Sequence, residues 1–192
     1  MRKIVFITGT RADYGKIKSV IKMLDNDDIF DVYIYVTGMH LLKKYGSTYI
    51  EIQKDGFNNI FLSKQIDNSL SMDEILANNI LEFTKFVKNI KPDMIFVHGD
   101  RVEAMAGAIV GALNNIYVSH IEGGEISGTI DESIRHAISK LANFHFVSNE
   151  LSKKNLIQMG EDANNIFVVG SPDIDIMMKN NYDIDCVKKK YN

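Results

Sequence analysis

The chain has 192 residues and a net charge of −3, with 45% hydrophobic and 24% charged residues, as is typical of a globular protein. This slight negative charge gives no electrostatic reason to expect a nucleic acid or an anionic membrane as partner. The single cysteine, Cys186, excludes an internal disulfide framework and a cysteine-based zinc cluster.

The N-terminal residues 1–9 contain too short and too β-branched an apolar run for a signal peptide. No apolar stretch approaches the roughly 20 residues of a membrane-spanning helix. We therefore expect a cytoplasmic protein without a membrane partner.

Strand-like and helix-like segments alternate along the whole chain. In chain order we predict a strand at 3–8, a helix carrying Ile17, Val20, Ile21 and Leu24, a strand at 31–37, a broken helical pattern at 39–55, a short strand at 59–62, a helix at 71–89, a strand at 94–97, a helix at 102–113, a strand at 116–119, a helix at 131–141, a strand at 144–148, a helix at 150–159 and a strand at 166–169.

The helix at 71–89 has the clearest pattern. Ser71 and Glu74 have the spacing of a capping box at its start, and Pro92 closes it. Repeated β-α units with short connections predict an α/β fold, a mostly parallel sheet with helices on both faces. We assign residues 1–172 to this domain, and the polar residues 173–192 to a linker or to the start of a second domain.

Acidic residues follow the ends of predicted strands in three segments. Asp100 follows the strand at 94–97, Glu122 follows the strand at 116–119, and Asp131 begins the next helix. Ligands of parallel α/β sheets bind beyond the carboxyl ends of the strands. Carboxylates that meet there repel one another and separate their pKa values, which suits acid and base chemistry.

Each of these residues also has a purely structural interpretation. Asp100 has the position of a helix N-cap, and His98 is either a buried core histidine or a ligand contact. Asp131 has the spacing for an ion pair with Arg135, one turn later on the same helix. We assign Glu125 to solvent.

Two glycine-containing loops complete the candidate site. Gly9 and Arg11, after the first strand, suit an anion bound at a helix N-terminus, although a plain turn with a surface arginine is the alternative. The loop lacks the Walker and dinucleotide spacings, which disfavours ATP and NAD. Gly123 and Gly124 predict a flexible loop or one that closely approaches a ligand.

Several segments together resemble the hydrolysing UDP-N-acetylglucosamine 2-epimerases of bacterial sialic acid synthesis. They are G-T-R-A-D-Y-G at 9–15, H-G-D-R at 98–101, H-I-E-G-G-E at 120–125, T-I-D-E-S-I-R-H at 129–136 and V-G-S-P-D at 169–173. Non-hydrolysing relatives typically carry G-T-R-P-E in the first loop. The resemblance implies the Rossmann-like N-terminal half of a two-domain, glycosyltransferase-B-like enzyme about twice as long.

The resemblance also implies a reaction. UDP is eliminated from UDP-N-acetylglucosamine with loss of the C2 proton, and water then adds to 2-acetamidoglucal to give N-acetylmannosamine, with no metal or other cofactor. The family's catalytic carboxylates map onto Asp100, Glu122 and Asp131, and its first-loop arginine maps onto Arg11, near the diphosphate. The expected substrate contacts are Gly9, Arg11, His98, Gly123 and Arg135.

Other interpretations remain open. The same chemistry on UDP-N,N'-diacetylbacillosamine is the nearest alternative, a glycosyltransferase is disfavoured by the three carboxylates, and a non-catalytic sugar-nucleotide-binding module is a further possibility. For residues 1–192 alone we expect weak UDP binding and negligible turnover, and for the full-length protein a homo-oligomer, either a dimer or a tetramer.

Overall fold

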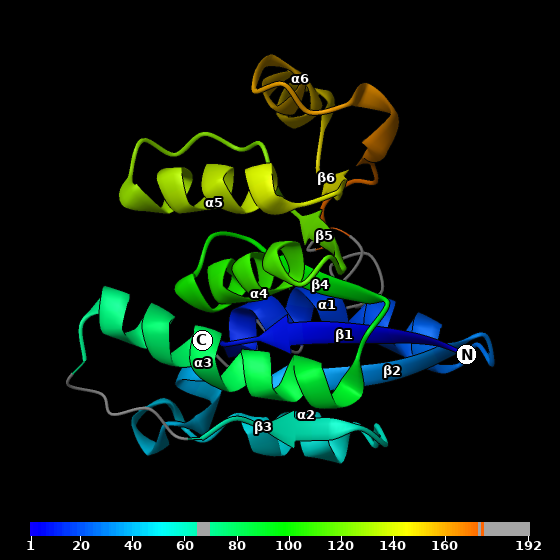
Figure 1. Cartoon of the computed structure of the whole chain (residues 1–192), viewed down its shortest axis with the longest axis vertical. Coiled ribbons are helices and arrows are strands. Elements are labelled where there is room, and N and C mark those ends of the chain that lie inside the picture. The colour runs from blue at the N-terminus through cyan, green and yellow to red at the C-terminus, as the bar shows by residue number, and fades with distance from the viewer. Residues whose placement is uncertain (65–69, 173, 175–192) are drawn as a thin grey trace, which may run out of the picture.

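The computed structural model describes residues 1–64, 70–172 and 174, and its strands form one parallel seven-stranded sheet (Figure 1). The order is β3-β2-β1-β4-β5-β6-β7. The strands β2 and β3 therefore extend the sheet on one side of β1, and β4 to β7 extend it on the other side. The strands are β1 Arg2–Thr8, β2 Phe30–Val36, β3 Ile60–Leu62, β4 Met94–His98, β5 Tyr117–Ile121, β6 Phe144–Val147 and β7 Ile166–Val168.

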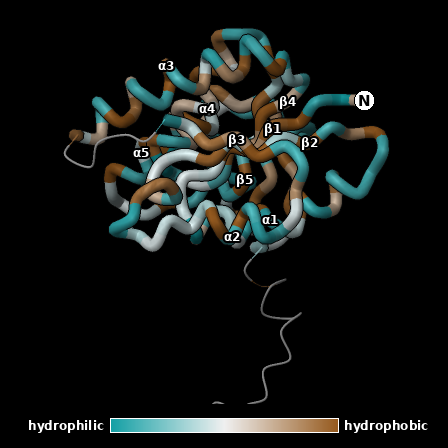
Figure 2. Tube along the Cα trace, turned by 90° about the horizontal axis from the view of Figure 1, so that it is seen from below, coloured by the Kyte–Doolittle hydropathy of each residue, from teal (hydrophilic) through white to brown (hydrophobic). Residues whose placement is uncertain are grey.

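Helices cover both faces of this sheet, as predicted (Figure 2). Along β1, Val5 and Ile7 pack in one apolar cluster with α3, α4 and α5, whereas Ile4 and Phe6 pack in a second cluster with α1 and α2. This division follows from the alternation of side chains along a strand. The helices are α1 Arg11–Asp25, α2 Tyr49–Lys54, α3 Met72–Ile90, α4 Val102–Leu113, α5 Ile130–Leu141 and α6 Glu150–Gln158.

The α3 helix begins and ends where its sequence predicts. The backbone amide of Ser71 donates a 2.8 Å hydrogen bond to the Glu74 carboxylate, which is one half of the capping box. Phe83, on the apolar stripe of the helix, is completely buried, a contribution of about 1.5–3 kcal/mol for such a side chain. The helix ends at Ile90, two residues before Pro92.

The fifth strand is longer at its carboxyl end than the sequence predicts. The expectation of residues 116–119 was wrong because His120 and Ile121 continue the pairing with β4, opposite Val97 and His98. A polar histidine after a short apolar run indicates a loop, but His120 is completely buried. The extension carries β5 directly to Glu122.

The remaining sequence predictions agree with the described elements within a few residues. The broken helical pattern at 39–55 is two short 3₁₀ turns, Gly38–Leu41 and Lys43–Tyr45, followed by α2. A third such turn, Ala163–Asn165, precedes β7. None of the helices in the described part of the chain combines the length and apolar character needed to cross a membrane. The predicted segment 173–192, with Cys186, lies outside the described residues except for residue 174.

The α4 helix approaches the sheet closely because glycine replaces larger residues on its inner face. A Cβ atom at Gly111 would lie less than 3.0 Å from a methyl carbon of Val118 on β5, and 3.3 Å from Ile95 on β4. By contrast, a Cβ atom at Gly15, in α1, would meet no atom within 4 Å.

These two helical glycines give a matched test of the packing. We expect Gly111→Ala to lower the free energy of unfolding by about 1–3 kcal/mol, because the added methyl group overpacks the core. We expect Gly15→Ala to raise it by about 0.5–1 kcal/mol, since alanine loses less backbone entropy. Urea unfolding of both variants measures the difference, and equal effects would contradict the close packing of α4.

Candidate active site

A cleft of about 240 Å³ lies where the loops after β1, β4 and β5 meet. The strand order places it at the switch point between β1 and β4, from which the connections lead to opposite sides, the usual ligand position in such sheets. Its lining residues are Thr10, Ala12, Asp13, Lys16, His98, Gly99, Asp100, Arg101, Glu122, Glu125 and Arg135.

Glu122 lies at the centre of a charged contact across the switch point. Its carboxylate accepts hydrogen bonds from the Lys16 ammonium at 2.8 Å and from His98 Nε2 at 3.0 Å, which joins α1, β4 and the end of β5. Its backbone is in the left-handed region, with φ of 60°, which is uncommon outside glycine and is often found at functional sites. Burial alone would raise the pKa of Glu122, but the bonds from His98 and Lys16 outweigh it and lower the pKa to about 2.

Asp100 is held by Arg135, which reaches it from α5. Arg135 donates from Nη2 to the Asp100 carboxylate and from Nη1 to the backbone carbonyl of Glu125 at 2.9 Å. Only 8% of Arg135 is exposed, so its guanidinium is a buried link between two loops of the cleft. The sequence had suggested a pair between Asp131 and Arg135, but Arg135 instead pairs with Asp100 from another element.

A buried histidine supports the loop that carries Asp100. His120 Nε2 donates to the carbonyl of Gly99 at 2.7 Å, and its Nδ1 accepts from the Ser139 hydroxyl at 3.0 Å. Burial lowers the pKa of His120 to about 3, so the ring is neutral at neutral pH. A Cβ atom at Gly123 would lie 2.8 Å from both His120 and Ser139.

The two glycines of this loop therefore have a packing role that the sequence analysis did not foresee. Gly123 leaves room for the His120 ring, and a Cβ atom at Gly124 would come within 3.0 Å of the Ser152 carbonyl on α6. Both are buried beneath the cleft.

The backbone amides of the first loop bind a carboxylate of the same chain. The Asp13 carboxylate accepts from the backbone amides of Gly9 at 3.0 Å and Thr10 at 3.1 Å, and the Thr10 hydroxyl caps the Asp13 amide. The expected anion site at these amides is thus already filled by Asp13. Arg11 does not line the cleft; it is largely exposed and lies 3.4 Å from the Glu51 carboxylate on α2.

The structure therefore brings together His98, Asp100, Glu122 and Arg135, with Gly9 and Gly123 buried beside them. Asp131 lies on the exposed first turn of α5 and is not among the lining residues. Glu125, which the sequence analysis assigned to solvent, does line the cleft and accepts a 2.7 Å bond from the Ser148 hydroxyl. That assignment was wrong because the Gly124 turn directs the chain back over α6.

Sequence reasoning missed Lys16, Arg101 and Asp13 as cleft residues. Lys16 lies on α1 one turn after Asp13, and the i,i+3 spacing of the two places them on the same side of the helix that follows β1. This spacing was the available signal. In residues 1–64, 70–172 and 174, no three His, Cys, Asp or Glu side chains are grouped so as to hold a metal ion.

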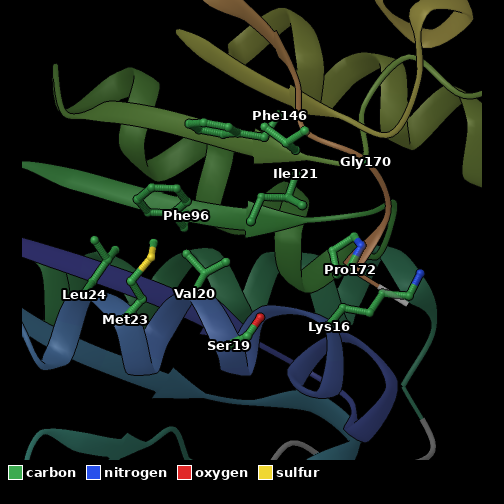
Figure 3. Close-up of a pocket in the computed structure, with 11 residues that line it drawn as sticks. Lys16, Ser19, Val20, Met23, Leu24, Phe96, Ile121, Phe146, Gly170 and Pro172 are labelled. Carbon is green, nitrogen blue, oxygen red and sulfur yellow. The ribbon is translucent and has the colours of Figure 1, made fainter. Parts of the chain in front are cut away.

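An apolar groove of about 340 Å³ adjoins the cleft, and Lys16 lines both (Figure 3). Its floor is formed by Phe96, Ile121 and Phe146 from the three strands β4, β5 and β6, and α1 forms one wall. Gly170 and Pro172, after β7, lie at the end near Lys16. The charged cleft and the apolar groove thus meet at one lysine.

Known proteins share both this sequence and this fold. The chain is 47% identical to a UDP-N-acetylglucosamine 2-epimerase of Neisseria meningitidis serogroup B, with 92% of the chain and 47% of the relative covered. It is 44% identical to a hydrolysing UDP-N,N'-diacetylbacillosamine 2-epimerase of Legionella pneumophila, with 93% of the chain and 48% of the relative covered. The chain therefore spans about half the length of the curated relatives it matches.

A solved structure has a similar fold. A crystal structure of a UDP-GlcNAc 2-epimerase from Neisseria meningitidis bound to UDP-GlcNAc superimposes with a TM-score of 0.82 at 25% identity, over 98% of this chain and 52% of that one. This agreement confirms the Rossmann-like fold. The family model described as UDP-N-acetylglucosamine 2-epimerase matches residues 22–192, and the chain accordingly belongs to that family.

Proposed function

We propose that this chain contributes the acidic wall of the active site of a hydrolysing UDP-N-acetylglucosamine 2-epimerase. The observation that carries the proposal is the pairing of Asp100 with Arg135 and of Glu122 with Lys16 and His98 in one cleft at the switch point. The similarity to the Neisseria and Legionella relatives supports the reaction class. The first-loop sequence G-T-R-A-D-Y-G favours the hydrolysing branch.

The reaction requires a base, a stabilised anion and a proton donor. Elimination removes the weakly acidic C2 proton and breaks the C1–O bond to UDP; hydration then returns a proton to C2 and adds water at C1. We assign removal of the C2 proton to Asp100 or Glu122. The contacts from Lys16 and His98 keep Glu122 anionic, so it can stabilise positive charge that develops on the sugar. To act as the base it would have to lose one of these contacts, because a pKa of about 2 makes a carboxylate a weak proton acceptor.

We assign Asp131 to proton delivery or to water addition. It lies on the exposed first turn of α5, one turn before Arg135, whose guanidinium holds Asp100. Asp131 is therefore open to solvent and is not among the residues that line the cleft. Proton donors for a hydration step benefit from such access to solvent.

The second candidate substrate is UDP-N,N'-diacetylbacillosamine, favoured by the 44% identity to the Legionella relative. A non-catalytic sugar-nucleotide-binding module is the candidate from another class, since the chain spans about half of its relatives. Homo-oligomer formation and a cytoplasmic location remain predictions.

The reaction is tested with the chain alone and with the chain replacing the matching part of the Neisseria meningitidis relative. We expect negligible turnover and weak UDP binding alone, and free N-acetylmannosamine with deuterium at C2 when the fused protein acts in heavy water. A retained UDP-sugar product would indicate the non-hydrolysing reaction. Turnover of only the bacillosamine derivative would favour the second substrate.

The three carboxylates are tested in the same fused protein by Asp100→Asn, Glu122→Gln and Asp131→Asn. We expect each change to slow at least one of the two steps by about 100-fold or more, the usual effect of removing an acid or base. Turnover is measured separately on the UDP-sugar and on 2-acetamidoglucal. If any one variant keeps full rates in both steps, the residue it replaces is not catalytic. Glu150→Gln on α6 is the control.

The charge state of Glu122 gives a pH-dependent prediction. Its pKa is about 2 in the folded chain against an ordinary value of 4.5, so its stabilisation is fully present above pH 4.5 and is lost as the pH falls toward 2. We expect Glu122→Gln to lower the free energy of unfolding at pH 7 by roughly 2–3 kcal/mol, and by less at pH values near 3. Glu51→Gln, at an exposed ion pair, is the control with little change. A carboxyl NMR titration of Glu122 with a midpoint at or above 4.5 would contradict the assignment.

A further inference from the structure

The two carboxylate oxygens of Glu122 have different partners. Oε2 accepts hydrogen bonds from Lys16 at 2.8 Å and from His98 at 3.0 Å. Oε1 accepts a hydrogen bond from the Ser171 hydroxyl at 3.3 Å, from a residue 49 positions later in the chain. This distance is longer than the spacing of about 2.7–2.8 Å that is most common for O–H···O bonds, so we expect it to be the weakest of the three contacts.

Ser171 lies in the segment after β7, and backbone hydrogen bonds on both sides hold it. The Val169 amide donates to the Val147 carbonyl of β6 at 3.0 Å, so the chain is still attached to the sheet two residues before Ser171. Gly170 then has a positive φ of 85°, a conformation that glycine adopts readily. The Ile174 amide donates to the Ser171 carbonyl at 3.1 Å. The position of the hydroxyl therefore depends on the turn at Gly170.

The same segment runs past the apolar groove. Gly170 and Pro172, on either side of Ser171, line the end of this groove (Figure 3). The Ser171 hydroxyl instead contacts Glu122, which lines the charged cleft. Glu122 itself is placed by the sheet, because its amide donates to the Phe146 carbonyl of β6 at 2.9 Å. Ser171 thus connects the segment after β7 with a carboxylate of the cleft.

A second donor changes what the carboxylate of Glu122 can do. The last torsion of a glutamate side chain has a broad range, so contacts at one oxygen alone would leave the plane of the carboxylate free to turn. A hydrogen bond from Ser171 to Oε1 restricts this rotation and also favours the ionised form. Groups that stabilise a developing charge are most effective when they are already oriented before the charge forms.

We propose that Ser171 is a positioning residue for Glu122, and that the turn at Gly170 sets the orientation of the carboxylate through it. A change in the course of the segment after β7 is thereby transmitted to the charged cleft. Ser171 acts through Glu122 and does not itself touch the reacting atoms. Its effect on turnover rests on the proposed function, whereas the connection from Gly170 to Glu122 does not.

The contact is tested in the 192-residue chain by the ¹³C NMR signal of the Glu122 carboxyl group, at neutral pH and on acidification. We expect Ser171→Ala to shift this signal and to raise the pKa of Glu122 by about 0.5–1, because the anion loses one donor. Lys16, His98 and the other charged side chains of the cleft stay in place in this variant. Ser171→Thr keeps a hydroxyl and the wild-type signal, and Ser63→Ala, which removes a hydrogen-bonded hydroxyl beside β3, is the control without effect.

The turn is tested by a matched pair of glycine substitutions. Gly170 and Gly160 have positive φ values of 85° and 89°, and an added Cβ atom would meet no atom within 4 Å at either position. Alanine therefore strains the backbone at both positions without a clash. We expect Gly170→Ala to shift the Glu122 signal in the same direction as Ser171→Ala, and Gly160→Ala, in the turn after α6, to leave it unchanged. Equal shifts in the two glycine variants, or an unchanged signal in Ser171→Ala, would overturn the proposal.

The effect on turnover is measured in the fused protein. We expect Ser171→Ala to lower kcat several-fold with little change in KM, the pattern for an interaction that matters in the transition state, and Ser171→Thr to restore most of it. A wild-type kcat, or a change confined to KM, would overturn the positioning role. A Glu122 signal that depends on Ser171 in a fused protein without epimerase activity would support the connection and reject the reaction. An active fused protein whose Glu122 signal ignores Ser171 would reject the connection alone.

Discussion

The order of the strands constrains everything in the candidate site. Because β4 lies directly beside β1, the α1 and α4 helices begin side by side at one edge of the sheet. In this arrangement Lys16 from α1 and His98 from β4 both contact Glu122 at the end of β5. The strand order therefore determines which charged and polar side chains of the cleft contact one another.

The charged side chains of the cleft are paired with partners from other helices, strands or loops. Buried or half-buried ions cost several kcal/mol of desolvation unless a partner and further hydrogen bonds compensate them. Glu122 has Lys16 and His98, and Asp100 has Arg135, which is itself fixed by the Glu125 carbonyl. Such pairs hold carboxylates ionised in a partly dry site, which is the state that a base or a group that stabilises positive charge needs.

Periodicity and strand-end positions were enough to predict the fold and part of this site from the sequence. Alternating β-α patterns placed the described strands and helices within a few residues, and the rule about carboxyl ends placed His98, Asp100 and Glu122 in one cleft. That rule does not cover side chains that enter the cleft from a helix face: Lys16 was missed, and Arg135 was expected only from the family resemblance. The Arg135 contact with Asp100 spans 35 residues, whereas sequence spacing alone suggested its neighbour Asp131. The packing role of the glycines at 123–124 was not predicted, because three of the side chains or backbone groups they approach, in Ser139, Ser152 and Leu156, belong to later elements of the chain.

Arg11 and Arg101 differ in how firmly their carboxylate partners orient them. The pair between Arg11 and Glu51 is exposed on both sides, and such pairs contribute between about 0 and 1 kcal/mol. Breaking it costs little, so Arg11 is able to change partners but gains little orientation from its present one. The pair between Arg101 and Glu103 is closed over by two loops and oriented through two hydrogen bonds. Stabilisation of a developing charge depends on groups that are already in place when the charge forms. On that physical ground Arg101, whose partner is a buried carboxylate, is more firmly oriented than Arg11, whose partner is exposed.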